Sequence, residues 1–349
     1  MARIITGPRL VSKILRKCFW LYVSAAQRIW SYLPDSFRDL KLVRAYGRGL
    51  HRLVCRHADR KPYFTTFFLR NRPELKLLCQ LADRQNYDGN LNIAILACSK
   101  GAETYSIAWA IRNARPDMQL RITAVDISQE ILDFARRGIY SLSGPDTDTS
   151  GYASARELSD ISRNTSIDQN ESMFERMTDD EMHQMFEVRG QEARVLGWLR
   201  EGITWLRADA TELSPGGGMS PQDIVVANRF LCHMAPADAR RCLRNVARLV
   251  KPGGYLFCSG VDLDVRTEVA RDLGWRPLLE LIREIHDGDP SIQKGWPGEY
   301  WGLEPFDDRQ PDWNIRYACA FQIGDTIEAR RSPRADNYPE SKRQPRRLA

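Results

Sequence analysis

One tight turn and two acidic residues carry the chemistry that this sequence first suggests. Residues 91–97 are a continuous apolar run, as in a strand buried on both faces, and a polar turn ending at Gly101 precedes a helical pattern that begins with Glu103. Asp126 closes the next strand-like run, 25 residues after Gly101. Such a turn points backbone N–H groups at a ligand, and an acid ending the second strand can accept hydrogen bonds from two ribose hydroxyls. The pattern predicts half of an α/β nucleotide-binding unit.

The strand and helix alternation continues to residue 262. A third strand should end near Asp209, close to the base of a bound nucleotide, and a fourth should leave the sheet at Asn228 and Arg229. A helix over residues 237–250 is then predicted to end at the KPGG turn, followed by a fifth strand. This order is typical of the second half of a class I S-adenosyl-L-methionine (SAM) methyltransferase. A dinucleotide dehydrogenase would need G-x-G-x-x-G after the first strand, and Gly101 is the sole glycine in that turn.

Three blocks narrow this prediction to one family. CSKGAETYSIAWAI (98–111), AVDISQEILDFARRGIYS (124–141) and MTDDEMHQMF (177–186) resemble the CheR-type chemotaxis-receptor methyltransferases, here in a diverged form, over about residues 63–262. The resemblance implies a Rossmann-like α/β sheet with helices on both faces, preceded by a helical N-terminal domain. It also implies methyl transfer from SAM to protein glutamate carboxylates, with S-adenosyl-L-homocysteine as the product. The family's receptor docking depends on its N-terminal domain and on a small β-subdomain, and neither is clearly matched in this sequence.

The resemblance also carries a set of cofactor residues. It implies that Glu103 takes the amino end of SAM, that Asp126 takes the ribose hydroxyls, and that Asp209 and Ala210 lie beside the adenine. The segment TTFFLR contains one residue more than the family's threonine–aromatic–arginine segment, so Arg70 is the predicted partner of the SAM carboxylate, with Leu69 as the competing alignment. Alternatively, Glu103 is an ordinary acid in a first helical turn and Asp126 a helix cap. The predicted cofactor set is Thr66, Arg70, Ala97, Gly101, Glu103, Asp126, Ile127, Asp209, Ala210 and Asn228.

The predicted acceptor end departs from the family. The family carries Arg-Asn after the fourth strand and a tyrosine five positions after the arginine, whereas this chain has Asn228-Arg229 and His233. A carboxylate acceptor is already ionised at neutral pH and needs positioning, whereas a hydroxyl acceptor needs a base. Asn228, Arg229 and His233 are therefore the predicted catalytic residues, with His233 either a base or a hydrogen-bonding replacement for the phenol. No metal is expected.

A Trp-rich insertion over residues 275–312 is the second departure. Residues 276–289 read as a helix, and residues 314–323 read as a closing strand. His286, Glu299, Tyr300 and Trp301 are candidates for the acceptor pocket, and packing under a long loop is the alternative for each. Three functions stay open: methylation of a protein glutamate, methylation of a small molecule or glycan with His233 as base, and a non-catalytic SAM-binding scaffold. Nucleic acid is not expected as a substrate, because ANRF replaces the tetrapeptide of base-flipping enzymes.

Charge divides the chain into regions. The predicted domains are a basic helical region (1–62), the methyltransferase domain (63–324) with a mobile loop (141–170), and a disordered tail (325–349). Residues 1–60 hold 13 Lys/Arg against 3 Asp, which favours an acidic partner or a membrane surface, with packing against an acidic core as the alternative. Residues 9–30 and 36–58 are predicted helices, the first with an interfacial character. No apolar run of membrane-spanning length and no signal peptide is read, so the expected location is cytoplasmic, with peripheral membrane attachment as an alternative.

Overall fold

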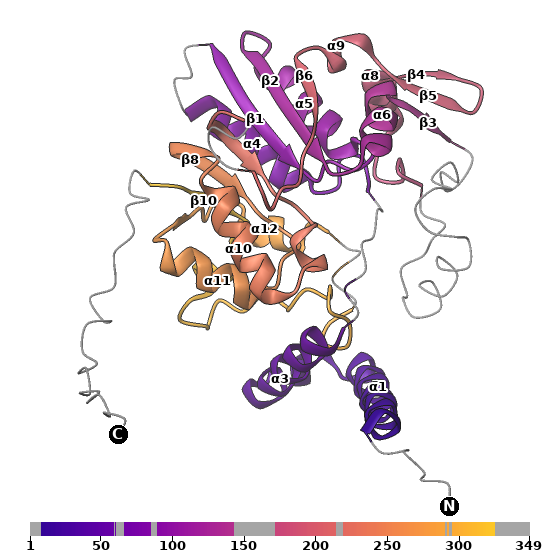
Figure 1. Cartoon of the computed structure of the whole chain (residues 1–349), viewed down its shortest axis with the longest axis vertical. Helices are drawn as coiled ribbons and strands as arrows, with labels where there is room; N and C mark the ends of the chain where they lie inside the picture. Colours follow the sequence, from indigo (N-terminus) through magenta and orange to yellow (C-terminus); the bar gives the residue numbers. More distant parts are fainter. Residues whose placement is uncertain are drawn as a thin grey trace, which may run out of the picture.

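The computed structural model describes residues 8–58, 60, 66–84, 89–142, 172–213, 219–289, 292 and 295–324, with side chains from residue 15 onward. Its centre is a seven-stranded sheet of order β6-β2-β1-β7-β8-β10-β9 (Figure 1). The first five strands in this order are parallel, and β10 runs antiparallel to both of its neighbours. The strands are β1 (Asn90–Leu96), β2 (Gln119–Asp126), β6 (Ile203–Arg207), β7 (Gln222–Val226), β8 (Val250–Phe257), β9 (Arg276–Pro277) and β10 (Ala320–Gln322).

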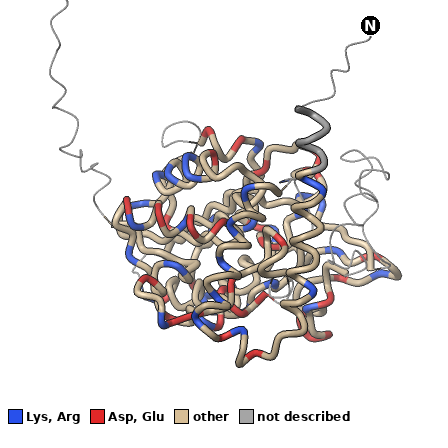
Figure 2. The backbone as a smooth tube through the Cα atoms, turned by 90° about the horizontal axis from the view of Figure 1, so that it is seen from below, with Lys and Arg blue, Asp and Glu red and all other residues tan. Residues whose placement is uncertain are grey.

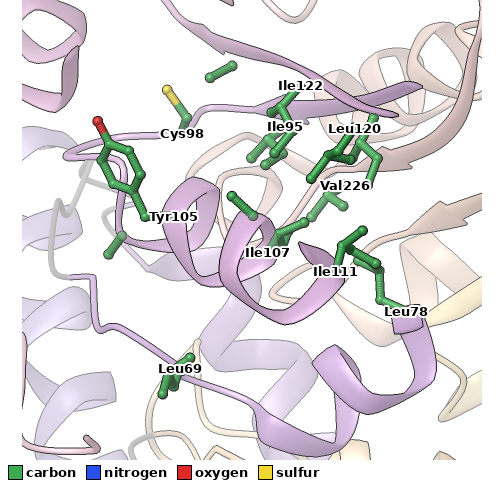
Figure 3. Close-up of a cluster of buried hydrophobic side chains, with 14 of the residues drawn as sticks. Leu69, Leu78, Ile95, Cys98, Tyr105, Ile107, Ile111, Leu120, Ile122 and Val226 are labelled. Atoms are coloured by element: carbon green, nitrogen blue, oxygen red, sulfur yellow. The ribbon is translucent and has the colours of Figure 1, made fainter. Parts of the chain in front are cut away.

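Each face of the sheet has its own apolar core because side chains alternate along the buried strands. Ile93 and Ile95 of β1 face α4 (Arg72–Arg84) and α5 (Ala102–Ala114), whereas Ala94 and Leu96 face α10 (Pro236–Ala247) and α11 (Leu263–Asp272). Figure 3 shows Ile95 and the neighbouring strand residues directed toward Ile107 and Ile111 of α5. The chain thus folds as the predicted α/β sheet, mostly parallel, with helices on both faces.

The strand order fixes where a ligand can bind. From β1 the chain proceeds to β2 and β6 on one side, and then returns to β7 and β8 on the other side. The order reverses between β1 and β7, and the loops leaving the carboxyl ends of these two strands border the crevice in which open α/β sheets bind ligands. The turn after β1 and the segment after β7 therefore lie on the same edge.

Several local predictions are confirmed. Asp126 ends β2, and α5 follows the turn at Gly101. The helix α6 (Gln129–Arg137) is capped by Ser128, whose hydroxyl accepts a hydrogen bond from the backbone N–H of Ile131 at 3.2 Å. The predicted mobile loop beyond residue 142 and the predicted tail from residue 325 lie outside the described residues.

Other local predictions are wrong. KPGG does not end the helix before it: α10 stops at Ala247, and these four residues belong to β8, where the pairing with β7 shifts register. The predicted helix over residues 276–289 shrinks to α12 (Ile282–Asp287), because Arg276 and Pro277 pair with β10. The closing strand is confined to β10, because residues 313–316 form α14 (Trp313–Arg316).

A small antiparallel sheet occupies a region where no β-subdomain was predicted. The helix α8 (Asp179–Met185) begins at a capping box between Thr178 and Glu181, and then β4 (Phe186–Arg189) and β5 (Glu192–Val195) form a hairpin. Gly190 turns the chain with φ of 61°, which a glycine adopts without strain. β3 (Ile139–Ser141) pairs with β5 and completes the three-stranded sheet. The short helices α9 (Gly197–Arg200) and η1 (Leu231–His233) complete the described elements.

The N-terminal helices lie below the sheet-containing body (Figure 1). They are α1 (Pro8–Tyr32), α2 (Asp35–Arg38) and α3 (Lys41–His57), and Val23 and Trp30 of α1 are buried in their packing. The insertion holds them in place: the rings of Trp30 and Trp296 meet edge to face at 4.8 Å, and Trp296 also packs against Gly47. Among the described residues, no helix is both long enough and apolar enough to cross a membrane.

Candidate active site

Asp126 is held firmly beside the turn that follows β1. One of its carboxylate oxygens accepts a hydrogen bond from the backbone N–H of Ser99 at 2.9 Å, and the other accepts from the N–H of Ser128 at 3.1 Å. Ala97 and Ser99 have positive φ values of 53° and 49°, so the turn is forced into a conformation that non-glycine residues rarely adopt. Strain of this kind persists where surrounding structure imposes it, often at ligand sites. Asp126 thus holds this turn, whereas the helix that follows it, α6, is capped by Ser128.

Gly101 serves packing as well as backbone conformation. It has φ of 85°, and a Cβ there would lie 3.0 Å from the Cβ of Ala135 and 3.3 Å from the ring of Trp205. A side chain at this position would push α5 away from α6 and β6. The predicted cofactor role of Gly101 is therefore joined by a structural one.

An amide connects the buried Glu74 to the half-buried Glu103 at the switch point. The Nδ2 of Asn228 donates to Glu103 at 2.8 Å and to Glu74 at 2.6 Å, and its Oδ1 accepts from the backbone N–H of Ser259 at 2.8 Å. Burial, followed by the charge of Glu103, raises the pKa of Glu74 to about 7. Burial also raises the pKa of Glu103, although Asn228 and nearby arginines oppose that rise. Asn228 therefore lies at the predicted amino end of SAM, linked directly to Glu103.

Arginines lie around this acid pair. Burial, and then the charge of Arg229, lower the pKa of Arg70 to about 10, while Asp289 and Glu103 act in the opposite direction. Arg229 pairs with the buried Asp289, which also lies 3.3 Å from Arg176. Leu69 is buried in the core, and its backbone N–H donates to Ser106 at 2.9 Å. Of the two residues that the competing alignments offer as the partner of the SAM carboxylate, Arg70 is the one whose charge reaches this cluster.

The remaining predicted cofactor residues lie along the same edge of the sheet. Ile127 follows Asp126 directly and is exposed. An exposed apolar side chain at this place is suited to cover the adenine ring of a bound cofactor. Asp209 follows β6, and its carboxylate accepts from the N–H and the hydroxyl of Thr211 at 2.8 and 2.7 Å. Ala210 packs against the core beneath, and Thr66 is half-buried just ahead of Phe67.

A cavity of about 250 Å³ adjoins the acid pair on the acceptor side. Its walls come from α3, from the loops after β7 and β8, and from α12 and the insertion. Arg229 and Asp289 belong both to this cavity and to the charged cluster beside Glu103. The described lining residues include seven arginines and four acids, so positive charge is in excess. The insertion therefore forms one wall of the cavity.

The predicted pocket residues separate into two groups. Tyr300 and Trp301 line the cavity, and the Tyr300 hydroxyl lies 3.4 Å from Nδ1 of His233. His286 also lines it, but its Nε2 bonds the carbonyl of Glu304 at 2.9 Å, and burial lowers its pKa to about 4, so it is a neutral part of the wall. Glu299 accepts from the indole of Trp301 at 2.7 Å and is not among the lining residues.

Two buried acids in this site were not predicted from the sequence. Glu74 lies in the first turn of α4, four residues after Arg70, and this proximity was the signal available for it. Asp289 carried no such signal, because only folding brings it to Arg229 and Arg176. Within the described part of the chain, no three His, Cys, Asp or Glu side chains are grouped so that they could hold a metal ion.

The fold and this edge define the class as a SAM-dependent methyltransferase domain. The family model "CheR methyltransferase, SAM binding domain" matches residues 64–263, which is more than half of the chain. The chain therefore belongs to the CheR methyltransferase family, and SAM is its cofactor.

Comparison with individual proteins gives partial matches. "Chemotaxis protein methyltransferase 2" of Pseudomonas aeruginosa is 35% identical over 133 residues, which are 34% of this chain and 45% of that protein. The chain thus matches less than half the length of this curated relative. A SAM-dependent methyltransferase from Mesorhizobium loti has a TM-score of 0.25 at 20% identity, covering 51% of this chain and 50% of that one. The N-methyltransferase NodS of Bradyrhizobium japonicum, solved with S-adenosyl-L-homocysteine, has a TM-score of 0.28 at 15% identity, covering 60% and 70%.

The residues present fit SAM. The amino acid end of this cofactor carries an ammonium and a carboxylate, and Glu103 and Arg70 provide the opposite charges within one cluster. The Asp126 carboxylate is already oriented by two backbone N–H groups and keeps acceptor capacity for hydroxyls.

Proposed function

We propose that this protein transfers the methyl group of SAM to an oxygen acceptor, and that the acceptor is a glutamate carboxylate of a protein. One observation carries the proposal: the arginine-rich cavity and the cluster around Glu103 share Arg229 and Asp289. An acceptor in the cavity would therefore lie next to the methionine end of the cofactor. The chemotaxis association in the name of the Pseudomonas relative supports a signalling protein as the acceptor.

Methylation of a carboxylate does not require a catalytic base. SAM would supply a methyl group on a positively charged sulfur. A carboxylate oxygen held in the cavity would bond to that carbon as the carbon–sulfur bond breaks, and S-adenosyl-L-homocysteine would leave. A glutamate acceptor is ionised at neutral pH, so the protein has only to hold it and to exclude water. The excess of arginine in the cavity wall favours an anionic acceptor and fixes its orientation. Arg229, paired with Asp289, is the arginine that the cavity shares with the cluster around Glu103, which supports a role for it in holding the acceptor.

A hydroxyl acceptor of a small molecule or glycan is the second candidate, and the contact between His233 and Tyr300 favours it. Burial raises the pKa of Tyr300, so its phenol stays protonated. If the phenol donates to Nδ1 of His233, the other ring nitrogen carries the proton and serves as a donor to a carboxylate. In the opposite tautomer, that nitrogen carries the lone pair that would accept the proton of a hydroxyl. The two candidates thus require different tautomers of the same residue.

The stability of the methylated product in base distinguishes a carboxylate acceptor from a hydroxyl acceptor. Protein incubated with tritium-labelled SAM and cell extract should yield a labelled product that releases volatile methanol in mild base, as a methyl ester does. A base-stable label would identify an ether and refute the carboxylate proposal. His233→Ala should lower turnover by a similar factor at every pH if His233 positions a carboxylate. A loss that changes with pH around the His pKa would instead support the base.

Cofactor binding has its own test. Calorimetric titration with SAM should give a saturable signal that Asp126→Ala weakens, since the ribose hydroxyls lose their acceptor. Arg207→Ala is a suitable control, because its guanidinium lies nearby but bonds only the carbonyl of Ile127 among the contacts described. Equal binding by the wild type and Asp126→Ala would remove the ribose assignment.

A further inference from the structure

A row of exposed apolar side chains runs along α1. At spacings of three and four residues it contains Leu15, Cys18, Tyr22, Ala25, Ile29 and Tyr32, and all six are exposed. Leu15 is 64% exposed, Ile29 65% and Tyr32 82%. This spacing places the six residues on one side of the helix. Val23, Ala26 and Trp30 lie on another side of α1, and their buried side chains pack this helix against the rest of the protein.

α3 extends this surface. Leu42, Tyr46, Gly49 and Leu53 follow the same spacing and are exposed, with Leu42 at 85%. The hydroxyls of Tyr22 and Tyr46 lie 2.8 Å apart, so the rows on the two helices are neighbours. Leu50 and Val54 point the other way, into the packing with α1. The two rows therefore form one continuous face, which we name the hairpin face.

The two helices that carry the hairpin face bear charge of a single sign, and the acids Asp35 and Asp39 lie in the segment that joins them. Neither α1 nor α3 contains an Asp or a Glu, and each contains five Lys or Arg residues. At 100° per residue, Lys17 and Arg28 border the row on α1, and Lys41 and Arg56 border the row on α3; all four are exposed. Over the rest of the body, acidic and basic residues are interspersed (Figure 2).

We propose that the hairpin face docks onto the surface of an anionic lipid bilayer. Exposed leucine, isoleucine and tyrosine side chains bordered by lysine and arginine are what an interfacial helix presents to lipid: the apolar row enters the acyl boundary while the cations meet the headgroups. A second copy of the chain is a poor occupant, because two faces without acids would repel each other. The surface is independent of methyl transfer, so each can fail without the other.

Docking of this kind leaves the acceptor cavity accessible. His51 and Cys55 of α3 line that cavity, and they lie on a different side of the helix from Leu42, Tyr46 and Leu53. Arg56, which borders the row on α3, also lines the cavity, so the bilayer would lie beside one edge of the cavity wall. The proposed enzyme would thus act on acceptors close to a membrane surface.

Vesicle sedimentation with the full chain tests the proposal. Binding is expected to vesicles of phosphatidylcholine with 30% phosphatidylglycerol, to weaken when salt is raised, and to be lost with phosphatidylcholine alone. Lys17→Gln or Arg28→Gln should each weaken binding by about fivefold, which corresponds to about 1 kcal/mol per charge at the surface. Lys76→Gln removes an exposed charge from α4 and should leave binding unchanged.

The apolar part of the face has a matched pair of variants. Ile29→Asp should abolish vesicle binding, whereas Leu279→Asp, at another exposed apolar position, should not. Both residues are exposed, so both variants should fold, and circular dichroism checks this. Absence of binding to anionic vesicles would overturn the proposal, as would equal binding by Ile29→Asp. Self-association lost in Ile29→Asp, or binding of polyglutamate without vesicle binding, would overturn it in favour of a second copy or an acidic protein.

Discussion

Replacing Glu74 with glutamine should stabilise the protein, and only above a defined pH. Glu74 is buried, and its pKa rises from an ordinary value of 4.5 to about 7 because of burial and the neighbouring charge of Glu103. A pKa difference of one corresponds to about 1.4 kcal/mol, so the ionised carboxylate destabilises the folded state by about 3 kcal/mol. Glutamine keeps an oxygen that can accept from Asn228, as Glu74 does at 2.6 Å.

The direction in which stability changes with pH follows from the number of protons that the folded and unfolded chains bind. Below pH 4.5 the side chain is protonated in both the folded and the unfolded chain, so Glu74→Gln changes little. Between pH 4.5 and about 7 the folded chain keeps a proton that the unfolded chain has lost, and wild-type stability falls as pH rises. The advantage of the variant should therefore grow through this window and level off above pH 7.

Urea unfolding of both proteins at steps from pH 4.5 to 8.5 measures this difference. Glu280→Gln is the matched control with the opposite sign, because a hydrogen bond from Arg84 lowers the pKa of Glu280, so its removal should destabilise the protein above pH 4.5. A difference between Glu74→Gln and wild type that stays flat from pH 5 to pH 8 would show that Glu74 titrates normally and would refute the reasoning.

Three further predictions concern packing and the acceptor end. Gly260→Ala should destabilise the fold by more than Gly274→Ala, as measured by urea unfolding. Both glycines have positive φ, and a side chain in that conformation costs about 1–2 kcal/mol. Of the two added Cβ atoms, only the one at position 260 would meet another atom closely, the Cα of Arg229 at 2.7 Å. Equal losses would mean that this close approach costs nothing. Trp296→Ala should cost about 3–5 kcal/mol and speed proteolysis within α3, because Trp296 is buried against Trp30 and Gly47; unchanged proteolysis would show that the N-terminal helices are held by other contacts. Arg229→Gln should raise KM for an anionic acceptor more than KM for SAM, since the boundary of the cavity loses a positive charge. Equal effects on both would indicate that Arg229 acts on the cofactor instead.

Local patterns were sufficient for the cofactor half of the site. Apolar runs predict β1 and β2 because parallel strands are buried on both faces, and the acid that ends β2 is placed by that strand alone. The cap at Ser128 is likewise local, because its side chain bonds within its own helix turn. Motif spacing was enough to identify the CheR methyltransferase family, as the match over residues 64–263 confirms.

The acceptor half depended on the tertiary structure. Glu74 and Asn228 meet across 154 positions of sequence, and Tyr300 meets His233 across 67, so no local pattern encodes either contact. KPGG was predicted as a helix end from its glycines, but Val250 and Tyr255 on either side of it pair with β7, and this pairing draws the segment into β8 as an irregularity in the register. The sequence by itself determined where the strands end and which acid follows them, because these depend on neighbours along the chain. Only the folded chain decided that an acid pair, an arginine-lined cavity and the insertion share one edge, because burial and charge act between residues that the chain brings together from far apart.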